Sequence, residues 1–206
     1  DLKNLFFETK DFELNQKIGS GAFGCFHIVT NVNDGKKYIA KTLKIHELSG
    51  KEQMNFINEA IIHSKLHHPA ISKLFGINFH SFDDEELLHP TIIENYFPKG
   101  SLYDILSLER RSSSDTNWNY TKKLINIIGI AHAMKYMHSQ AIAHRNLKPG
   151  NIYLDDNYYP HISDFAYSDI CTVDSDWIDL IGTPLYMAPE IIKGTPYGLP
   201  VDVFSF

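Results

Sequence analysis

The 206-residue sequence contains only two cysteines, Cys25 and Cys171, and nothing pairs them at a metal-ligand spacing. A disulfide framework and a cysteine-based zinc site are therefore not expected, and a reducing compartment such as the cytoplasm fits this cysteine usage. Basic residues are also in short supply, since 19 Lys and Arg against 25 Asp and Glu give a formal net charge of −6. This balance argues against nucleic acid or an anionic membrane surface as the main partner.

The sequence also lacks a long hydrophobic run. The longest mostly apolar stretch, residues 124–134, is interrupted by Asn126 and His132 and is far too short to cross a bilayer. No basic segment followed by an apolar run opens the chain, so no signal peptide is expected. The chain starts at Asp1 and stops within the apolar stretch 201–206, so we expect both ends to be cut.

With 43% hydrophobic and 21% charged residues, the chain has the composition of a globular protein. Up to about Tyr96 the sequence pattern predicts mainly strands. Short segments rich in β-branched and aromatic residues, separated by turn signals, predict an antiparallel meander at 12–18, 25–31 and 37–43. An amphipathic helix is predicted at 51–66, followed by two further strands at 71–79 and 90–96.

Helices dominate from residue 100 onward, with predicted segments at 102–108 and 120–138. One side of the second helix carries Leu124, Ile127, Ile128, Ala131, Met134 and Met137. The change of periodicity predicts a smaller lobe, residues 1–97, with five antiparallel strands and one helix. A mainly helical lobe, residues 98–206, would follow a hinge near 95–98, and the two lobes would form one domain of about 12–206.

Gly19, Gly21 and Gly24 form a Gly-x-Gly-x-x-Gly pattern between two predicted strands. A dinucleotide-binding fold needs this loop to lead from a strand into a helix, so the context argues against that fold. Glycines at a hairpin tip let backbone N–H groups approach a polyphosphate closely. The pattern by itself is a weak signal, because an ordinary glycine-rich turn has the same composition.

An ordered series of motifs follows the glycines: Ala40-Lys41 on a strand, Glu59 in a helix, His144 to Asn151 in a loop, Asp164-Phe165-Ala166, and Met187 to Glu190. The series resembles the eukaryotic protein kinase family and covers almost the whole chain. Lys148 resembles the serine/threonine type, and Gly182-Thr183-Pro184 resembles its tyrosine-kinase-like branch. The resemblance implies an α+β, two-lobed fold whose C-terminal lobe is incomplete here, because the family's domain continues past Asp202.

The resemblance also implies a role for each matched residue. Lys41, held by an ion pair with Glu59, would bring a cation to the phosphates of ATP. Asp164 and Asn151 would supply oxygen ligands to Mg²⁺, and Lys148 would neutralise charge on the transferred phosphoryl group. Asp202 would brace the loop that contains His144. The remaining nucleotide contacts would come from Gly19, Gly21, Gly24, Phe26, Ala40, Glu94, Tyr96 and Tyr153.

Several positions depart from the family's pattern. Asn146 stands where active members have the Asp that accepts the substrate's proton, and a carboxamide cannot be that base. Phe26 and Tyr153 enlarge two residues expected to contact adenine, and Glu94 places a carboxylate at the position behind it. Two more departures are Ala166 in place of a glycine and His63 on the helix face that carries Glu59.

These departures favour a catalytically impaired pseudokinase that acts in signalling or scaffolding through protein partners, with weak or absent binding of ATP and Mg²⁺. A slow but genuine serine/threonine kinase acting on a protein substrate is the first alternative, and a non-functional fragment is the second. Whether the chain is an enzyme is left open by the sequence, with inactivity or very weak activity favoured. Nothing in the sequence indicates a nucleic-acid or membrane partner or an oligomeric state.

Overall fold

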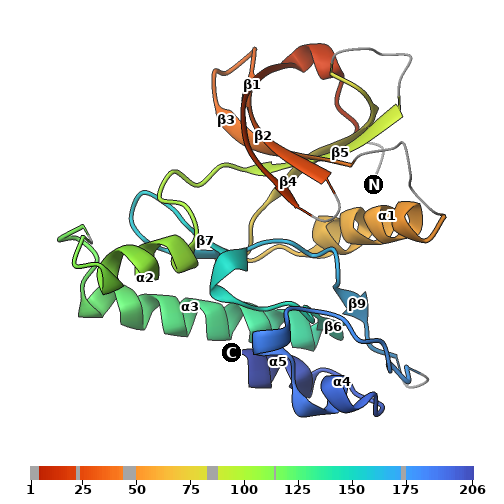
Figure 1. Cartoon of the computed structure of the whole chain (residues 1–206). Coiled ribbons are helices and arrows are strands. Elements are labelled where there is room, and N and C mark those ends of the chain that lie inside the picture. Colours follow the sequence, from red (N-terminus) through yellow and green to blue (C-terminus); the bar gives the residue numbers. More distant parts are fainter. Residues whose placement is uncertain (1–4, 22–23, 44–49, 83–87, 114, 173–174) are drawn as a thin grey trace. The chain divides into compact units, whose positions relative to one another are not determined.

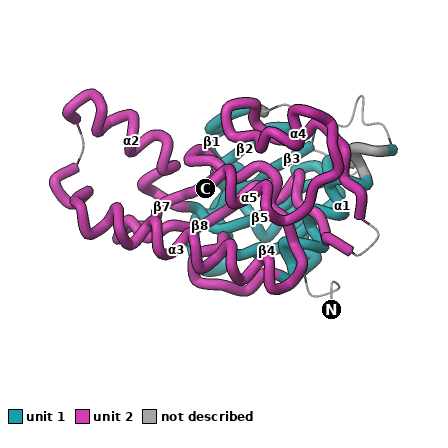
Figure 2. Tube along the Cα trace, turned by 90° about the horizontal axis from the view of Figure 1, so that it is seen from below, with its two compact units in different colours: residues 1–65, 73–96 teal, residues 66–72, 97–206 magenta. Residues whose placement is uncertain are grey.

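The computed structural model describes residues 5–21, 24–43, 50–82, 88–113, 115–172 and 175–206. The chain forms two compact units, residues 1–65 with 73–96 and residues 66–72 with 97–206 (Figure 2). The short stretch 66–72 belongs to the second unit because Ser72 N donates to Ile162 O at 2.8 Å and Ile71 forms a β-bridge with Ile162.

A five-stranded antiparallel sheet forms the first unit, with strand order β1-β2-β3-β5-β4 (Figure 1). The strands are β1 (Phe12–Gly21), β2 (Gly24–Asn31), β3 (Lys37–Leu43), β4 (Leu74–His80) and β5 (Leu88–Asn95), and the helix is α1 (Gly50–Lys65). A short 3-10 helix, Thr9–Asp11, precedes β1. The structure confirms the predicted five antiparallel strands and single helix of this part of the chain.

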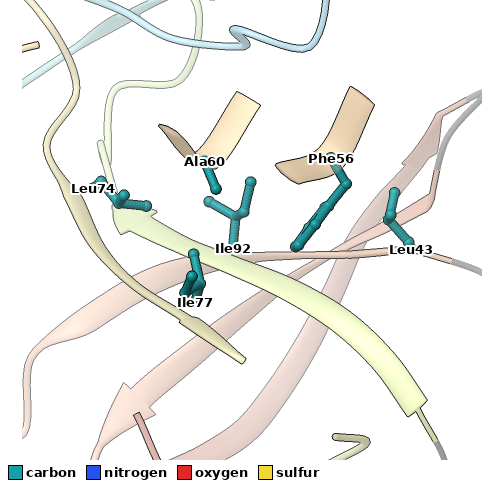
Figure 3. Packing of buried hydrophobic residues seen from close by; sticks show 6 residues of the cluster. All are labelled: Leu43, Phe56, Ala60, Leu74, Ile77 and Ile92. Atoms are coloured by element: carbon teal, nitrogen blue, oxygen red, sulfur yellow. The ribbon is translucent and has the colours of Figure 1, made fainter. Parts of the chain in front are cut away.

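The two faces of this sheet bury different side chains because consecutive strand residues point to opposite sides. On one side, α1 contributes Phe56 and Ala60, which meet Ile92 of β5 and its neighbours (Figure 3). The full cluster is Leu43, Phe56, Ala60, Leu74, Ile77 and Ile92. Ile93, the next residue of β5, packs on the other side with Phe12, Val29, Tyr38 and Ala40.

The second unit is mainly helical (Figure 1). Its helices are α2 (Leu102–Arg110), α3 (Tyr120–Ser139), α4 (Pro189–Lys193) and α5 (Pro200–Ser205), with 3-10 turns at Pro149–Asn151 and Pro184–Tyr186. Its two small antiparallel sheets pair β6 (Ile142–Ala143) with β9 (Asp169–Ile170), and β7 (Ile152–Leu154) with β8 (Pro160–Ile162). Within the described ranges, no helix is both long and apolar enough to span a bilayer.

The apolar side of α3 is buried only in part. Ile127 and Ile128 are about half exposed, at 55% and 50%, whereas the buried residues are Asn126, Ile130, Ala133, Met134 and Met137. Asn126 fixes this face, because its Nδ2 donates to Tyr158 O at 2.8 Å. Gly129 fixes it as well, since a Cβ there would lie 2.8 Å from the Pro160 side chain. A polar residue and a glycine therefore mark the packed side of α3.

Candidate active site

The glycine pattern lies at the hairpin between β1 and β2, where Gly19 pairs with Phe26 and Gly21 pairs with Gly24. Ala22 and Phe23 lie outside the described residues. The glycines meet different surroundings, because a Cβ at Gly24 would lie 2.2 Å from Thr42 O, whereas a Cβ at Gly19 would have nothing within 4 Å. Position 24 thus requires glycine for the close approach of two strand backbones, independently of any ligand.

We expect Gly24→Ala to lower the free energy of unfolding by about 1–3 kcal/mol, because the obstacle is the backbone of Thr42 and cannot rotate away. Gly19→Ala is the matched control in the same hairpin, with open space around the added methyl group. Denaturant midpoints of the two variants measure the difference. Equal midpoints would contradict the steric explanation.

Lys41 of β3 and Glu59 of α1 form a buried ion pair within the first unit. The Lys41 Nζ donates to both carboxylate oxygens of Glu59, at 2.7 and 2.9 Å, and both side chains are only 6% exposed. Removing either partner would leave an uncompensated buried charge, so the pair fixes both side chains. The lysine that the resemblance assigns to the nucleotide phosphates is therefore held in one place by the glutamate predicted to hold it.

The neighbours of Lys41 correct one predicted contact. Ala40 points to the opposite face of β3 and is fully buried in the cluster around Phe12 and Ile93, so it is not available to a ligand on the Lys41 face. The residue before it, Ile39, shares the face of Lys41.

Phe26 and Glu94 also lie on the Lys41 face of the sheet. Phe26 is directly opposite Lys41 in the pairing of β2 with β3, and Glu94 is directly opposite Ile39 in the pairing of β3 with β5. Directly opposed residues of antiparallel strands point to the same face, at Cβ separations of about 5 Å. An aromatic ring and a carboxylate therefore flank the lysine. Tyr96 follows β5 directly and is half-buried.

In the second unit, the Asp202 carboxylate organises the loop that starts at His144. Its Oδ2 accepts hydrogen bonds from His144 N at 2.8 Å and from His138 Nε2 at 2.9 Å, and its Oδ1 accepts from Arg145 N at 2.8 Å. Asp202 is only 1% exposed. Arg145 has a left-handed backbone conformation with φ +61°, which the surrounding contacts must hold in place. The hydrogen bonds to the backbone of His144 and Arg145 are those that the predicted bracing role of Asp202 requires.

His144 is fully buried, and both ring nitrogens have partners. Its Nε2 lies 3.2 Å from the carbonyl oxygen of Ser163, and its Nδ1 accepts from Asn146 N at 3.2 Å. A carbonyl only accepts, so the proton is on Nε2 and the ring is neutral. Burial lowers the pKa of His144 below its usual value. This histidine therefore acts as a neutral structural link between two loops.

The pKa shift predicts that acid weakens the fold. Because folded His144 binds its proton more weakly than unfolded His144, its full contribution to stability is present above the unfolded pKa of about 6.5. That contribution is lost as the pH falls from there toward the folded pKa. We expect the denaturant midpoint to fall between about pH 7 and pH 5.5, and to fall less in His144→Gln. Parallel midpoint curves for the two proteins would contradict this assignment.

Asn146 lies at the centre of a hydrogen-bond network. Its Oδ1 accepts from Thr183 Oγ1 at 2.9 Å, and its Nδ2 donates to Asp164 Oδ2 at 3.3 Å. Thr183 Oγ1 in turn accepts from Lys148 Nζ at 2.7 Å. These bonds fix the orientation of the carboxamide, with its N–H side toward the carboxylate and its oxygen toward the hydroxyl.

The candidate metal ligands Asn151 and Asp164 come from adjacent segments. Asn151 Nδ2 donates to Asn146 O at 2.9 Å, and Ser163 N donates to Asn151 O at 2.9 Å. This brings the 151 amide beside the segment that carries Asp164. Asp164 has a left-handed φ of +65°, which Asp tolerates better than most residues. Ala166 does not adopt a positive φ, so alanine fits there without strain.

Among the described residues, no group of three or more His, Cys, Asp or Glu side chains is arranged to hold a metal ion. Asp164 and Asn151 supply one carboxylate and one amide oxygen. This pair suits Mg²⁺, which is commonly held by one or two protein oxygens together with substrate phosphates and water.

Tyr153 of β7 belongs to an aromatic stack. Its ring lies 6.3 Å from the ring of Phe97, with an interplanar angle of 21°, and Phe97 stacks on His161 at 4.3 Å. The backbone of Tyr153 also forms an isolated antiparallel β-bridge with Ser101. The ring is therefore packed against neighbours within the second unit.

The sites that the resemblance predicts thus form two groups. Lys41 and Glu59 meet in the first unit, and Asn146, Lys148, Asn151 and Asp164 meet in the second. Thr183 joins the second group, although the sequence predicted no site role for it. A single threonine in a loop does not indicate a site role, so the neighbouring Gly182 was the only feature of the sequence that pointed to Thr183.

Comparison with protein families matches residues 12–206 to the description "Protein kinase domain". The cAMP-dependent protein kinase type 3 of Saccharomyces cerevisiae is 31% identical over 201 residues, covering 97% of this chain and 47% of the relative. An Aurora kinase of Yarrowia lipolytica is 33% identical over 200 residues, covering 97% of this chain and 50% of the relative.

A further relative is the probable serine/threonine-protein kinase MARK-C of Dictyostelium discoideum, which is 32% identical over 205 residues, covering 98% of this chain and 25% of the relative. The chain therefore spans half or less of the length of these relatives. The domain match covers both units and every residue of the candidate site. The chain belongs to the eukaryotic protein kinase family.

Proposed function

We propose that this kinase domain transfers phosphate slowly or not at all and acts mainly by binding other proteins in signalling or scaffolding. Asn146 is the observation that carries the proposal. An amide does not take up a proton near neutral pH, so it cannot accept the proton of a substrate hydroxyl. The carboxamide is also engaged on both sides, by Thr183 and by Asp164.

The expected size of the defect follows from the lost chemistry. General-base assistance contributes about 10²–10⁴-fold to a rate, which corresponds to roughly 3–5 kcal/mol of barrier. Lys148 still supplies a positive charge beside Asn146, through Thr183. Charge stabilisation without a base is consistent with a slow reaction and not with a fast one.

The residues fit ATP and Mg²⁺ in part. The paired Lys41 would hold the phosphates, and Asp164 with Asn151 would hold Mg²⁺, which supplies charge neutralisation when bound. Phe26 opposes this fit, because its ring stands directly across from Lys41. Glu94 adds a carboxylate to the same face, and Tyr153 enlarges a residue that the family places against adenine. We infer that nucleotide binding is weak.

One observation favours the second candidate function, a slow serine/threonine kinase. The Lys41–Glu59 pair is buried and intact, and a buried ion pair is seldom the most stable choice for a core. Its presence is consistent with a nucleotide-binding role. The two candidates differ in whether binding other proteins or transferring phosphate to a protein substrate is the main function.

A calorimetric titration of the 206-residue chain with ATP, with and without Mg²⁺, separates the candidates. We expect binding no tighter than about millimolar in either condition, and tighter binding in Phe26→Val with Tyr153→Leu. Lys41→Met is the matched control, because it removes the phosphate contact and leaves the aromatic residues unchanged. Micromolar Mg²⁺-dependent binding, with phosphate incorporation into a Ser/Thr protein that Lys41→Met abolishes, would overturn the proposal.

A further inference from the structure

The side chain of Arg145 contacts several groups of the second unit. Its Nε donates to Tyr167 O at 2.6 Å, and its Nη2 lies 3.3 Å from Asp169 Oδ2. The guanidinium carbon lies 4.6 Å from the ring centre of Trp177, within the range of a cation–π contact. The arginine side chain is only 8% exposed. Its charge is therefore compensated inside the protein.

Trp177 is itself firmly placed. The residue is 9% exposed, and its ring lies 5.8 Å from the ring of Tyr197. Tyr197 N donates to Trp177 O at 3.1 Å, and the Tyr197 hydroxyl donates to Asp179 O at 3.0 Å. The same cluster includes Ala143, the last residue of β6, and Val201 of α5, so the tryptophan packs close to Arg145 in the chain and on the helix that carries Asp202.

The C-terminal end of segment 175–183 also contacts Arg145. Gly182 has φ +107°, and a Cβ there would lie 2.7 Å from Arg145 O, so the two backbones touch. The next residue, Thr183, donates to Asn146. The segment is therefore fastened twice to the Arg145–Asn146 dipeptide, first through the Trp177 ring and then through residues 182–183.

In protein kinases, segments at this place are ordered by phosphorylation, because the new phosphate pairs with arginine. Here Arg145 already contacts the Asp169 carboxylate and the face of the Trp177 ring. The negative charge of Asp169 would also repel a phosphate group from Arg145. We propose that Trp177 and Asp169 are positioning residues that hold Arg145 and fix segment 175–183 on the catalytic loop without phosphorylation. This goes beyond the proposed function, because it holds whether or not the loop transfers phosphate.

Hydrogen exchange of the unphosphorylated 206-residue chain, its state checked by intact mass, tests the proposal without nucleotide or activity. We expect the Tyr197 amide, which donates to Trp177 O, to be protected, and its exchange to be about tenfold faster in Trp177→Leu. Trp177→Phe keeps a ring face and is expected to restore most of the protection. Asp169→Asn, which removes the charge without changing the shape, is expected to have a smaller effect of the same sign.

Trp118→Leu is the matched control, since Trp118 is buried in the same unit and packs on Tyr158. We expect it to leave exchange of the Tyr197 amide unchanged. In a double-mutant cycle, the joint effect of Arg145→Met and Trp177→Leu is expected to be smaller than the sum of the two single effects, because both remove the Arg145–Trp177 contact. Fast exchange of the Tyr197 amide in the unphosphorylated chain, or equal effects of Trp177→Phe and Trp177→Leu, would overturn the proposal.

Discussion

Replacing Asp202 by Ala is expected to lower the free energy of unfolding by about 2–6 kcal/mol. The carboxylate is the acceptor for the backbone N–H groups of His144 and Arg145, and a buried N–H without an acceptor costs about 1–3 kcal/mol. Asp202→Asn keeps one acceptor oxygen and places an N–H₂ group where the other was. This variant should therefore lose about 1–3 kcal/mol.

Denaturant unfolding of both variants measures the two losses. Asp156→Asn is the matched control on an exposed aspartate of the same unit, and we expect a change within about 0.5 kcal/mol. A second readout is local, because Arg145 depends on the Asp202 contact to hold its left-handed backbone. Exchange of the 144–146 amides should increase in Asp202→Ala more than elsewhere. An Asp202→Ala midpoint equal to that of the control would show that other contacts hold this loop.

Periodicity and motif order predicted much of this protein. The five strands and the helix of the first unit follow from segments whose apolar residues alternate or recur at helical spacing. The Lys41–Glu59 pair follows from the family resemblance, since the two residues are 18 positions apart and no local rule joins them. The site residues of the second unit were found in the same way.

Other features depend on packing that no local pattern shows. The packed face of α3 includes Asn126 and Gly129, a polar residue and a glycine, which hydrophobic periodicity does not pick out. The motif predicts a nucleotide contact at Ala40, but strand alternation turns this residue away from the Lys41 face. No sequence pattern singles out Trp177, and only the folded chain places Arg145 against its face.

The melting temperature of the Asn146→Asp variant is expected to depend on Mg²⁺. The new carboxylate would keep the hydrogen bond from Thr183, but its second oxygen would face Asp164 Oδ2, where Asn146 Nδ2 now donates at 3.3 Å. Two carboxylates this close raise the pKa of one of them and weaken the fold near neutral pH. We expect a lower melting temperature without metal and recovery when Mg²⁺ is added. Native chain and Asn146→Ser, which removes the amide without adding charge, should respond little to Mg²⁺.

The same substitution reports which defect limits catalysis. If the missing base were the only defect, Asn146→Asp would raise phosphate incorporation into a Ser/Thr protein by about 10²–10⁴-fold. A base cannot act on a phosphate donor that is not bound in line, so we expect little gain from Asn146→Asp when it is introduced by itself. The gain should emerge when it is combined with Phe26→Val and Tyr153→Leu, which makes the effects strongly non-additive. Lys41→Met in the combined variant controls for a contaminating kinase, because it should abolish the signal. A large gain from Asn146→Asp in the otherwise native chain would show that the nucleotide site is intact and that the base is the single missing part.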